Sequence, residues 1–178
     1  MSTITNNPQP PYPEELEELR AIADIQFYGA GDVFLPSNIQ VIRSKTTQRI
    51  RAVLLDGKIL ATLRASDYRF ILRIWGGIRL NNIIDYPFLR VIVSNKYSGY
   101  IIEGGNVFTK HIVFMDPHIR PGDEVLVLNE DLEVIAVGRA ILPGWISTLF
   151  SRGEAVRVRE SIKVVRNEGY KPSIYRGF

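Results

Sequence analysis

The sequence predicts an α+β protein of two small domains: a helix followed by a small sheet, and then a closed or nearly closed β-barrel. The helix is predicted from residues 14–27, where apolar residues recur at helical spacing after Pro13. From Ile39 onward the apolar pattern changes to the alternation of strands. Beyond the Asp-Tyr-Pro at residues 85–87, several short strands follow one another with one short helix among them.

Local patterns predict the remaining elements. Strands of the first domain are expected at residues 39–55, 58–66 and 69–75. A second helix is expected near Trp75 to Ile84, although Gly76 and Gly77 weaken its pattern. In the barrel domain a short helix is expected at residues 96–103. The strands of that domain are expected at residues 89–94, 106–116, 123–129, 134–142 and 155–161.

The domain limits follow from these elements. The start of the chain is rich in proline and is expected to be a flexible arm. The expected divisions are an arm at residues 1–13, a first domain at 14–86, a barrel domain at 87–166 and a tail at 167–178.

The composition excludes several classes of protein. There is no cysteine, so neither a disulfide framework nor a thiolate metal site can form. No stretch approaches the roughly 18–20 apolar residues of a membrane span. The start of the chain lacks the basic and apolar regions of a secretory signal. We therefore expect a cytoplasmic protein with no membrane partner.

Positive charge is concentrated in the second quarter of the chain. Residues 41–79 carry nine Lys/Arg and two Asp, whereas residues 1–40 carry one Arg and six acidic residues. Clustered basic residues are the expected footprint of a protein that binds a phosphate backbone.

Three arginines of this segment are candidate RNA contacts. Strand alternation puts Arg49 and Arg51 on the face opposite their apolar neighbours, and Arg64 closes the next strand. The alternative is a solvated face of ion pairs, for which only Asp56 and Asp67 are available locally. The pattern leaves both interpretations open.

A second candidate surface lies in the barrel domain. Tyr97, Tyr100 and Phe108 can stack on unpaired bases, with barrel packing the favoured alternative for Phe108. Between them, Gly104 and Gly105 form a turn that leaves backbone N–H groups accessible to a phosphate. The basic residues of the last strand that are predicted to share one face are Arg157 and Arg159.

Signals for catalysis are weak. A metal site of His111, His118 and Asp116 is conceivable, beside purely structural roles for both histidines. Asp123 and Glu124 are adjacent in a predicted strand and therefore point to opposite faces, so they cannot converge as an acid–base pair. No motif of a hydrolase, a zinc protease or a phosphate-binding loop is present. We expect no catalytic residue, no metal and no small-molecule cofactor.

Several motifs in a fixed order resemble the PUA family. They are GNVFTK at residues 105–110, IRPGDEV at 119–125, AVGRA at 136–140 and GEAVRV at 153–158. The resemblance implies a PUA pseudo-β-barrel that meets RNA with its short helix, the glycine loop after it and the last strand. The residues that occupy these positions here are Tyr97, Tyr100, Gly104, Gly105, Lys110, Arg157 and Arg159.

The first domain resembles the segment before the PUA domain in archaeal tRNA-guanine transglycosylases, called pre-PUA here. The motifs that carry this resemblance are ADIQF at residues 23–27, RIR at 49–51 and LATLR at 60–64. The chain departs from the family pattern where Tyr28 precedes Gly29 and where Tyr68 replaces a glycine after Asp67. The resemblance implies a small α/β pre-PUA domain that grips tRNA, and a catalytic (β/α)8 barrel with its zinc site on another polypeptide.

The expected function is therefore tRNA binding, in which the protein positions tRNA for a modification enzyme that acts in trans in archaeosine formation. Two alternatives stay open. One is a ribosome-associated or translation-factor-like PUA protein, and the other is an RNA-modifying enzyme with an unrecognised site.

Overall fold

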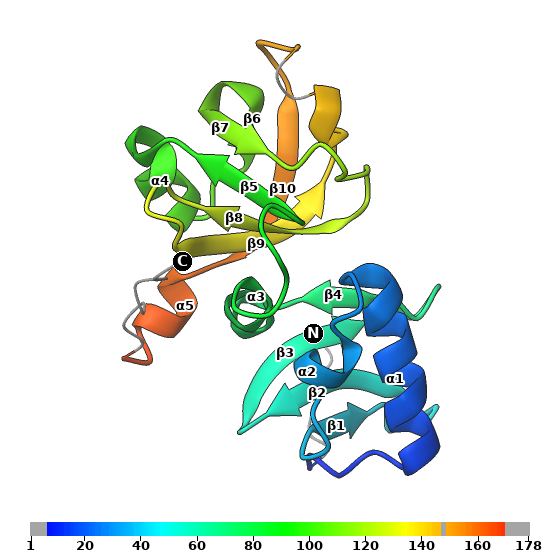
Figure 1. Cartoon of the computed structure of the whole chain (residues 1–178). Coiled ribbons are helices and arrows are strands. Elements are labelled where there is room, and N and C mark those ends of the chain that lie inside the picture. Colours follow the sequence, from blue (N-terminus) through cyan, green and yellow to red (C-terminus); the bar gives the residue numbers. More distant parts are fainter. Residues whose placement is uncertain (1–6, 147–148, 170–178) are drawn as a thin grey trace. The chain divides into compact units, whose positions relative to one another are not determined.

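The computed structural model describes residues 7–146 and 149–169, which form two compact units (Figure 1). The first unit ends at Ile83 and the second begins at Ile84. Within the described residues, no helix combines the length and the apolar character that crossing a membrane requires. The predicted α+β class is confirmed.

The first unit is an antiparallel sheet with helices before and after it. Its strands are neighbours in chain order, β1-β2-β3-β4, so each consecutive pair is a hairpin. The elements are α1 (Pro13–Gln26), α2 (Gly31–Phe34), β1 (Gln40–Arg43), β2 (Ile50–Leu55), β3 (Lys58–Leu63), β4 (Phe70–Leu72) and α3 (Ile74–Asn81).

An aromatic cluster holds the helices on this sheet. Phe27 follows α1, Phe34 ends α2 and Phe70 begins β4, and all three side chains are fully buried. Their ring centroids lie 5.3 to 6.3 Å apart in edge-on and stacked pairs, which is the geometry that aromatic rings prefer.

The motif at residues 23–27 has a structural role. The side-chain amide of Gln26 donates to the carbonyl of Phe70 at 3.1 Å and accepts the N–H of the same residue at 2.6 Å. It therefore occupies the open edge of β4 as a neighbouring strand would. Asp24 accepts the N–H of Gly31 at 2.7 Å and so fixes the start of α2.

Both departures from the family pattern fall on strained backbone. Tyr28 has φ 56° and Tyr68 has φ 57°, the left-handed region that glycine adopts without strain. Gly29 follows at φ 78° and ends the α1 region, as the sequence predicts. At both turns a tyrosine thus adopts the positive φ that a glycine would adopt more easily.

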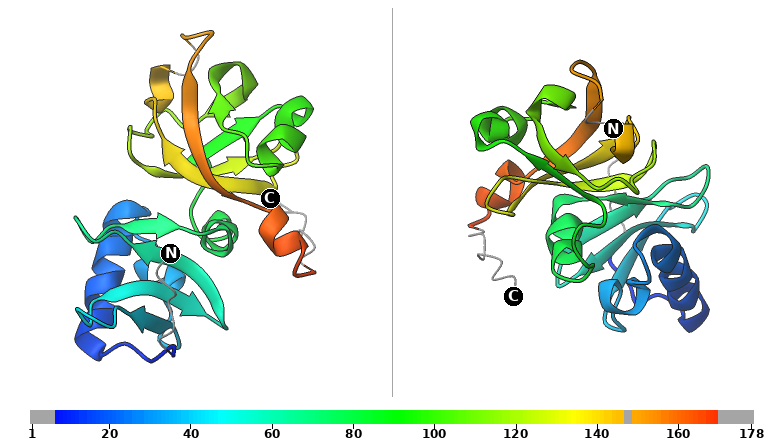
Figure 2. Two further views of the ribbon diagram at one scale, coloured as in Figure 1. Left: turned by 180° about the vertical axis from the view of Figure 1, so that it is seen from behind. Right: turned by 45° about the horizontal axis from the view of Figure 1, so that its top comes forward.

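The second unit is a six-stranded sheet in the order β6-β10-β9-β8-β5-β7. Its barrel-like curvature is visible from two further sides in Figure 2. All neighbours are antiparallel except β5 and β8. The elements are β5 (Arg90–Val93), α4 (Asn95–Ile102), β6 (Val107–Phe108), η1 (Thr109–His111), β7 (Ile112–Met115), β8 (Glu124–Leu128), β9 (Val134–Ala140), η2 (Gly144–Ile146), β10 (Glu154–Ser161) and α5 (Lys163–Arg166).

The strand predicted at residues 106–116 is two strands. Its centre is a 3-10 turn, η1, so that β6 pairs with β10 and β7 pairs with β5. Because three residues connect the two edge strands of the sheet, the sheet curls back on itself and becomes a pseudo-barrel.

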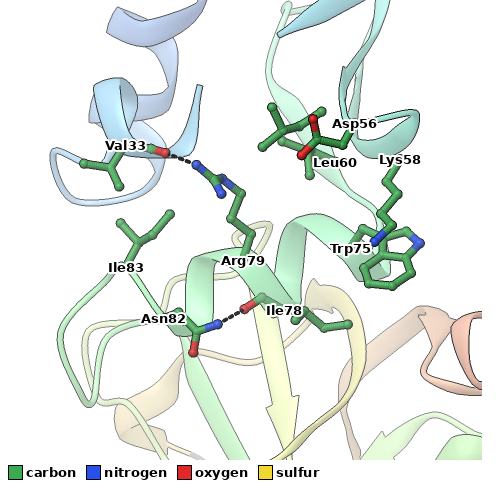
Figure 3. Close-up of a pocket in the computed structure, with 10 residues that line it drawn as sticks. Val33, Asp56, Lys58, Leu60, Trp75, Ile78, Arg79, Asn82 and Ile83 are labelled. Atoms are coloured by element: carbon green, nitrogen blue, oxygen red, sulfur yellow. Dashed lines mark hydrogen bonds between the residues drawn. The ribbon is translucent and has the colours of Figure 1, made fainter. Parts of the chain in front are cut away.

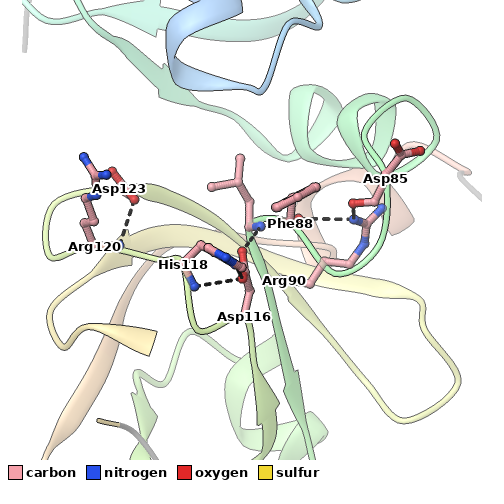
Figure 4. A network of polar contacts seen from close by, with 8 residues as sticks. Asp85, Phe88, Arg90, Asp116, His118, Arg120 and Asp123 are labelled. Carbon is pink, nitrogen blue, oxygen red and sulfur yellow. Dashed lines mark hydrogen bonds and ion pairs between the residues drawn. The ribbon is translucent and has the colours of Figure 1, made fainter. Parts of the chain in front are cut away.

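A buried polar network fixes the entry into the second unit (Figure 4). Asp116 is fully buried and accepts the N–H groups of Leu89 and His118, both at 2.9 Å. Arg90, only 2% exposed, donates to three carbonyls of the segment that precedes it. These are the carbonyls of Ile84, Asp85 and Phe88.

Other differences from the sequence prediction are local. The strand expected at residues 69–75 ends at Leu72, and α3 begins at Ile74 despite its two glycines. The arm is described from residue 7 on. There Gln9 exchanges two backbone hydrogen bonds with Val41, of 3.0 and 2.7 Å, so this part is attached to β1. The tail predicted at 167–178 lies outside the described residues beyond Gly169.

Candidate nucleic-acid interface

Aromatic rings from α4 and β6 surround one histidine of the second unit. The ring of His111 lies 4.4 Å from that of Tyr97 and 5.6 Å from those of Tyr100 and Phe108. Tyr97 is half-buried and Tyr100 is 52% exposed. The predicted stacking residues are therefore held in one cluster, with Tyr100 as its most accessible ring.

His111 holds this cluster in a neutral form. Its Nδ1 accepts the N–H of Phe108 at 3.2 Å, so the ring proton is on Nε2. Burial lowers the pKa of His111, and the positive charge of Lys110 lowers it further. His111 is thus a packing residue in η1 and not part of the strand that the sequence predicted.

The glycine turn after α4 does not offer its N–H groups as predicted. Gly104 donates to the carbonyl of Ile101 at 2.9 Å, and Gly105 donates to that of Tyr100 at 3.0 Å. Both N–H groups cap the C-terminus of α4, so the prediction of free donors for a phosphate is wrong.

Shape is what the two glycines provide. Gly104 has φ 103°, and a Cβ on Gly105 would lie 2.3 Å from the ring of Tyr100. The absence of side chains therefore lets Tyr100 lie directly over the turn. Lys110 is exposed beyond the turn, and its side chain has no ion pair within the described part of the chain.

The arginines of β10 are held by carboxylates. Arg157 is 67% exposed and pairs with Glu154 at 2.8 Å. Arg159 pairs at 2.5 Å with Glu124, whose side chain is only 2% exposed. Arg159 also lies in a bulge, because the register of β10 on β9 shifts between Val158 and Glu160. The regular alternation predicted for the two arginines is therefore interrupted.

The basic face of the first unit is partly ion-paired. Arg64 binds Asp67 at 2.9 Å. Arg43 binds Glu15 of α1 at 2.5 Å, a partner that local sequence could not indicate. The guanidinium of Arg43 holds the pKa of Glu15 below its usual range. Arg49 and Arg51, by contrast, make no side-chain ion pair within the described residues.

Two loops with matching backbone hydrogen bonds carry several basic residues of the first unit, an arrangement that the sequence patterns did not predict. In the β1–β2 loop the N–H of Ser44 donates to the carbonyl of Arg49 at 2.8 Å. In the β3–β4 loop the N–H of Arg64 donates to the carbonyl of Arg69 at 2.9 Å. Alternate hairpin loops of a meander lie at the same end of a sheet, so both loops project from one end. The sequence signal that could have indicated this pair of loops is an arginine at the last position of each, Arg49 and Arg69.

Among the described residues, no three histidine, aspartate or glutamate side chains are grouped as metal ligands. His118 instead contacts the buried Asp116, with Nδ1 3.0 Å from Oδ1.

Comparison with protein families assigns both units. Residues 17–87 match the patch-forming domain C2 of tRNA-guanine transglycosylase. Residues 89–162 match the PUA domain.

Curated relatives agree with this assignment. The chain is 38% identical over 146 residues to the tRNA-guanine(15) transglycosylase of Pyrococcus furiosus, a match that covers 82% of this chain and 24% of that protein. It is 42% identical over 148 residues to that of Thermoplasma volcanium, with 82% and 23% covered. The chain thus spans about a quarter of the length of these relatives.

Solved structures share the fold. A hypothetical protein of Pyrococcus horikoshii OT3 superposes with a TM-score of 0.71 at 22% identity, over 88% of this chain and 95% of that one. A conserved PUA domain protein of Thermoplasma acidophilum gives a TM-score of 0.60 at 20% identity, with 86% and 93% covered.

The barrel-like sheet and the matches define the class: the chain is a PUA-domain protein. In front of the PUA domain it carries the C2 domain of tRNA-guanine transglycosylases, and in these two domains it resembles the archaeal members of that family. A PUA domain in this setting fits RNA binding.

Proposed function

We propose that this protein binds tRNA and positions it for a modification enzyme that acts in trans, with archaeosine formation as the reaction served. The observation that carries the proposal is the pairing of the two matched domains. Residues 17–87 match a domain of tRNA-guanine transglycosylase and residues 89–162 match the PUA domain, so both units resemble parts of a family that acts on tRNA.

Phosphate contacts would supply most of the affinity. Arg49, Arg51 and Lys110 are the best candidates, because none of these side chains has an ion pair within the described residues. A free cation gains the whole interaction with a phosphate, whereas a paired one must first give up its carboxylate. Such contacts fix register and orientation and carry little sequence information.

The aromatic cluster of the second unit would contact an unpaired base. Tyr100 is the accessible ring, and its packing over Gly105 fixes its plane. His111 packs against the ring of Tyr100, and Tyr97 packs against His111, so that little side-chain freedom is lost when a base stacks.

Filter binding of tRNA over a salt series tests the proposal. Counterion release requires that affinity fall as salt rises, with a log–log slope of roughly −0.9 for each neutralised phosphate. The double variant Arg49→Ala/Arg51→Ala should flatten the slope by about 2. Arg120→Ala, an exposed arginine outside the predicted interface, is the matched control and should leave the slope unchanged. An affinity that does not respond to salt contradicts the proposal.

The action in trans is tested separately. We expect this protein to increase the rate at which a transglycosylase catalytic domain without its own PUA domain incorporates labelled base into tRNA. The same affinity for a ribosomal RNA fragment as for tRNA, with no stimulation of the enzyme, would favour a ribosome-associated role instead.

A further inference from the structure

The first unit contains a cavity of about 270 Å³ that the proposed phosphate contacts do not use (Figure 3). It is bounded by the β2–β3 turn, α3 and α2. Its volume is just below the roughly 300–1,000 Å³ of pockets that take drug-sized ligands, so the occupant should be a smaller planar or compact group.

Close packing of α3 on β3 forms this cavity. A Cβ on Gly76 would lie 2.0 Å from the carbonyl oxygen of Leu60, so only glycine lets the helix approach the strand this closely. The approach brings Trp75 beside the β2–β3 turn. In that turn Asp56 and Gly57 both have positive φ, of 50° and 76°, as a two-residue hairpin turn requires.

One face of the Trp75 ring lies against an exposed lysine. The ammonium of Lys58 lies 4.0 Å from the ring centroid, and Lys58 is exposed. A long exposed side chain in this place can be displaced by a planar ligand. It can then turn its charge toward a phosphate on the same ligand.

Two further polar side chains line the cavity. Arg79 is held by two carbonyls, Phe34 through Nε at 3.1 Å and Val33 through Nη2 at 2.5 Å. Its Nη1 has no hydrogen bond within the described part of the chain. Asn82 donates Nδ2 to the carbonyl of Ile78 at 3.3 Å, which leaves its Oδ1 as an acceptor. The cavity lining thus includes a donor in Arg79, an acceptor in Asn82 and a cation in Lys58, beside the indole of Trp75.

We propose that this cavity binds one unpaired nucleotide, its base stacked on Trp75 and its phosphate beside Lys58. The proposal rests on the RNA-binding function above, because a bound RNA would supply that nucleotide. The pocket charge supports an anionic occupant, since Lys58 and Arg79 outnumber Asp56. The aliphatic lining of Leu55, Ile78 and Ile83 suits the flat face of a base rather than free phosphate.

The test follows the two tryptophan indole N–H signals of the 15N-labelled full chain by NMR, with Trp145→Phe assigning Trp75. The probes are the four nucleoside 5′-monophosphates, ribose 5-phosphate and inorganic phosphate. Nucleotides should shift the Trp75 signal saturably, and the two probes without a base should not. Lys58→Ala and Asn82→Ala, both at exposed positions, should weaken nucleotide binding several-fold, whereas Arg120→Ala, at an exposed position outside both proposed sites, should not.

Binding of tRNA provides the second arm. Trp75→Ala should weaken tRNA binding by about 5- to 150-fold, the equivalent of one base–aromatic stack, with Trp145→Ala as control. A Trp75 shift without tRNA binding assigns the cavity to a free nucleotide and refutes the RNA function alone. Normal tRNA binding without a Trp75 shift refutes the cavity alone. A shift caused by N-acetylleucinamide but by no nucleotide assigns the cavity to a protein side chain and overturns the proposal.

Discussion

Replacement of Gln26 by alanine should destabilise the first unit, although Gln26 lies in one of the motifs that resemble the transglycosylase relatives. The substitution removes two hydrogen bonds, of 3.1 and 2.6 Å, that satisfy the carbonyl and N–H of Phe70. Phe70 is fully buried. With roughly 0.5–1.5 kcal/mol for each hydrogen bond, we expect a loss of about 1–3 kcal/mol in the free energy of unfolding.

Urea and thermal unfolding of a Trp145→Phe background measure this loss, because Trp75 is then the single tryptophan and reports on the first unit. The midpoint temperature should fall by at least about 4 °C, since 1 kcal/mol corresponds to roughly 4–8 °C in a domain of this size. Gln40→Ala in the edge strand β1 is the control, because no hydrogen bond of its side chain occurs within the described residues. If both variants unfold alike, Gln26 does not seal the sheet edge and its place in the motif has another cause.

Three further predictions concern the second unit. Arg159→Ala should cost about 3 kcal/mol, the lower end for a broken buried pair, because it removes the ion pair of the buried carboxylate of Glu124. Arg157→Ala should cost less than about 1 kcal/mol, because its pair with Glu154 is exposed, and denaturant unfolding compares the two variants. The folded state lowers the pKa of His111, so the contribution of this group to stability is complete above the ordinary histidine pKa and is lost as pH falls through the lower, folded pKa. The midpoint temperature of unfolding should therefore drop more between pH 7 and pH 5 in the wild type than in His111→Gln. Gly138→Ala should cost about 1–3 kcal/mol in the same unfolding assay, since its Cβ would lie 2.4 Å from the carbonyl oxygen of Arg157, and an unchanged stability would contradict that close strand contact.

Much of the fold could be predicted because its elements repeat simple patterns. The helix after Pro13 and the strands of both units follow from apolar spacing. The break at residues 109–111 could not be predicted, since Thr109, Lys110 and His111 fit a strand and a 3-10 turn equally well. Only the need to connect the two edges of the sheet decides between them.

The candidate interface was harder to predict because partners across the fold decide which cations are free. Local sequence offers Arg43 no acid, yet α1 brings Glu15 to it. Glu124 looks like a surface residue in a strand, yet it is buried and binds Arg159. The sequence likewise does not reveal which backbone N–H groups are hydrogen-bonded. The N–H groups of Gly104 and Gly105 were expected to be free, yet both cap the C-terminus of α4.

Ion pairing within the protein therefore separates two kinds of basic residue in a candidate RNA surface. Arg49, Arg51 and Lys110, whose side chains have no ion pair within the described residues, can release counterions in full when a phosphate arrives. Arg157 and Arg159 must exchange one anion for another, and Arg159 would leave a carboxylate buried. The paired arginines are accordingly suited to holding β10 in shape, and the free cations to holding RNA. Net charge alone could not make this distinction, because both kinds of residue contribute equally to it.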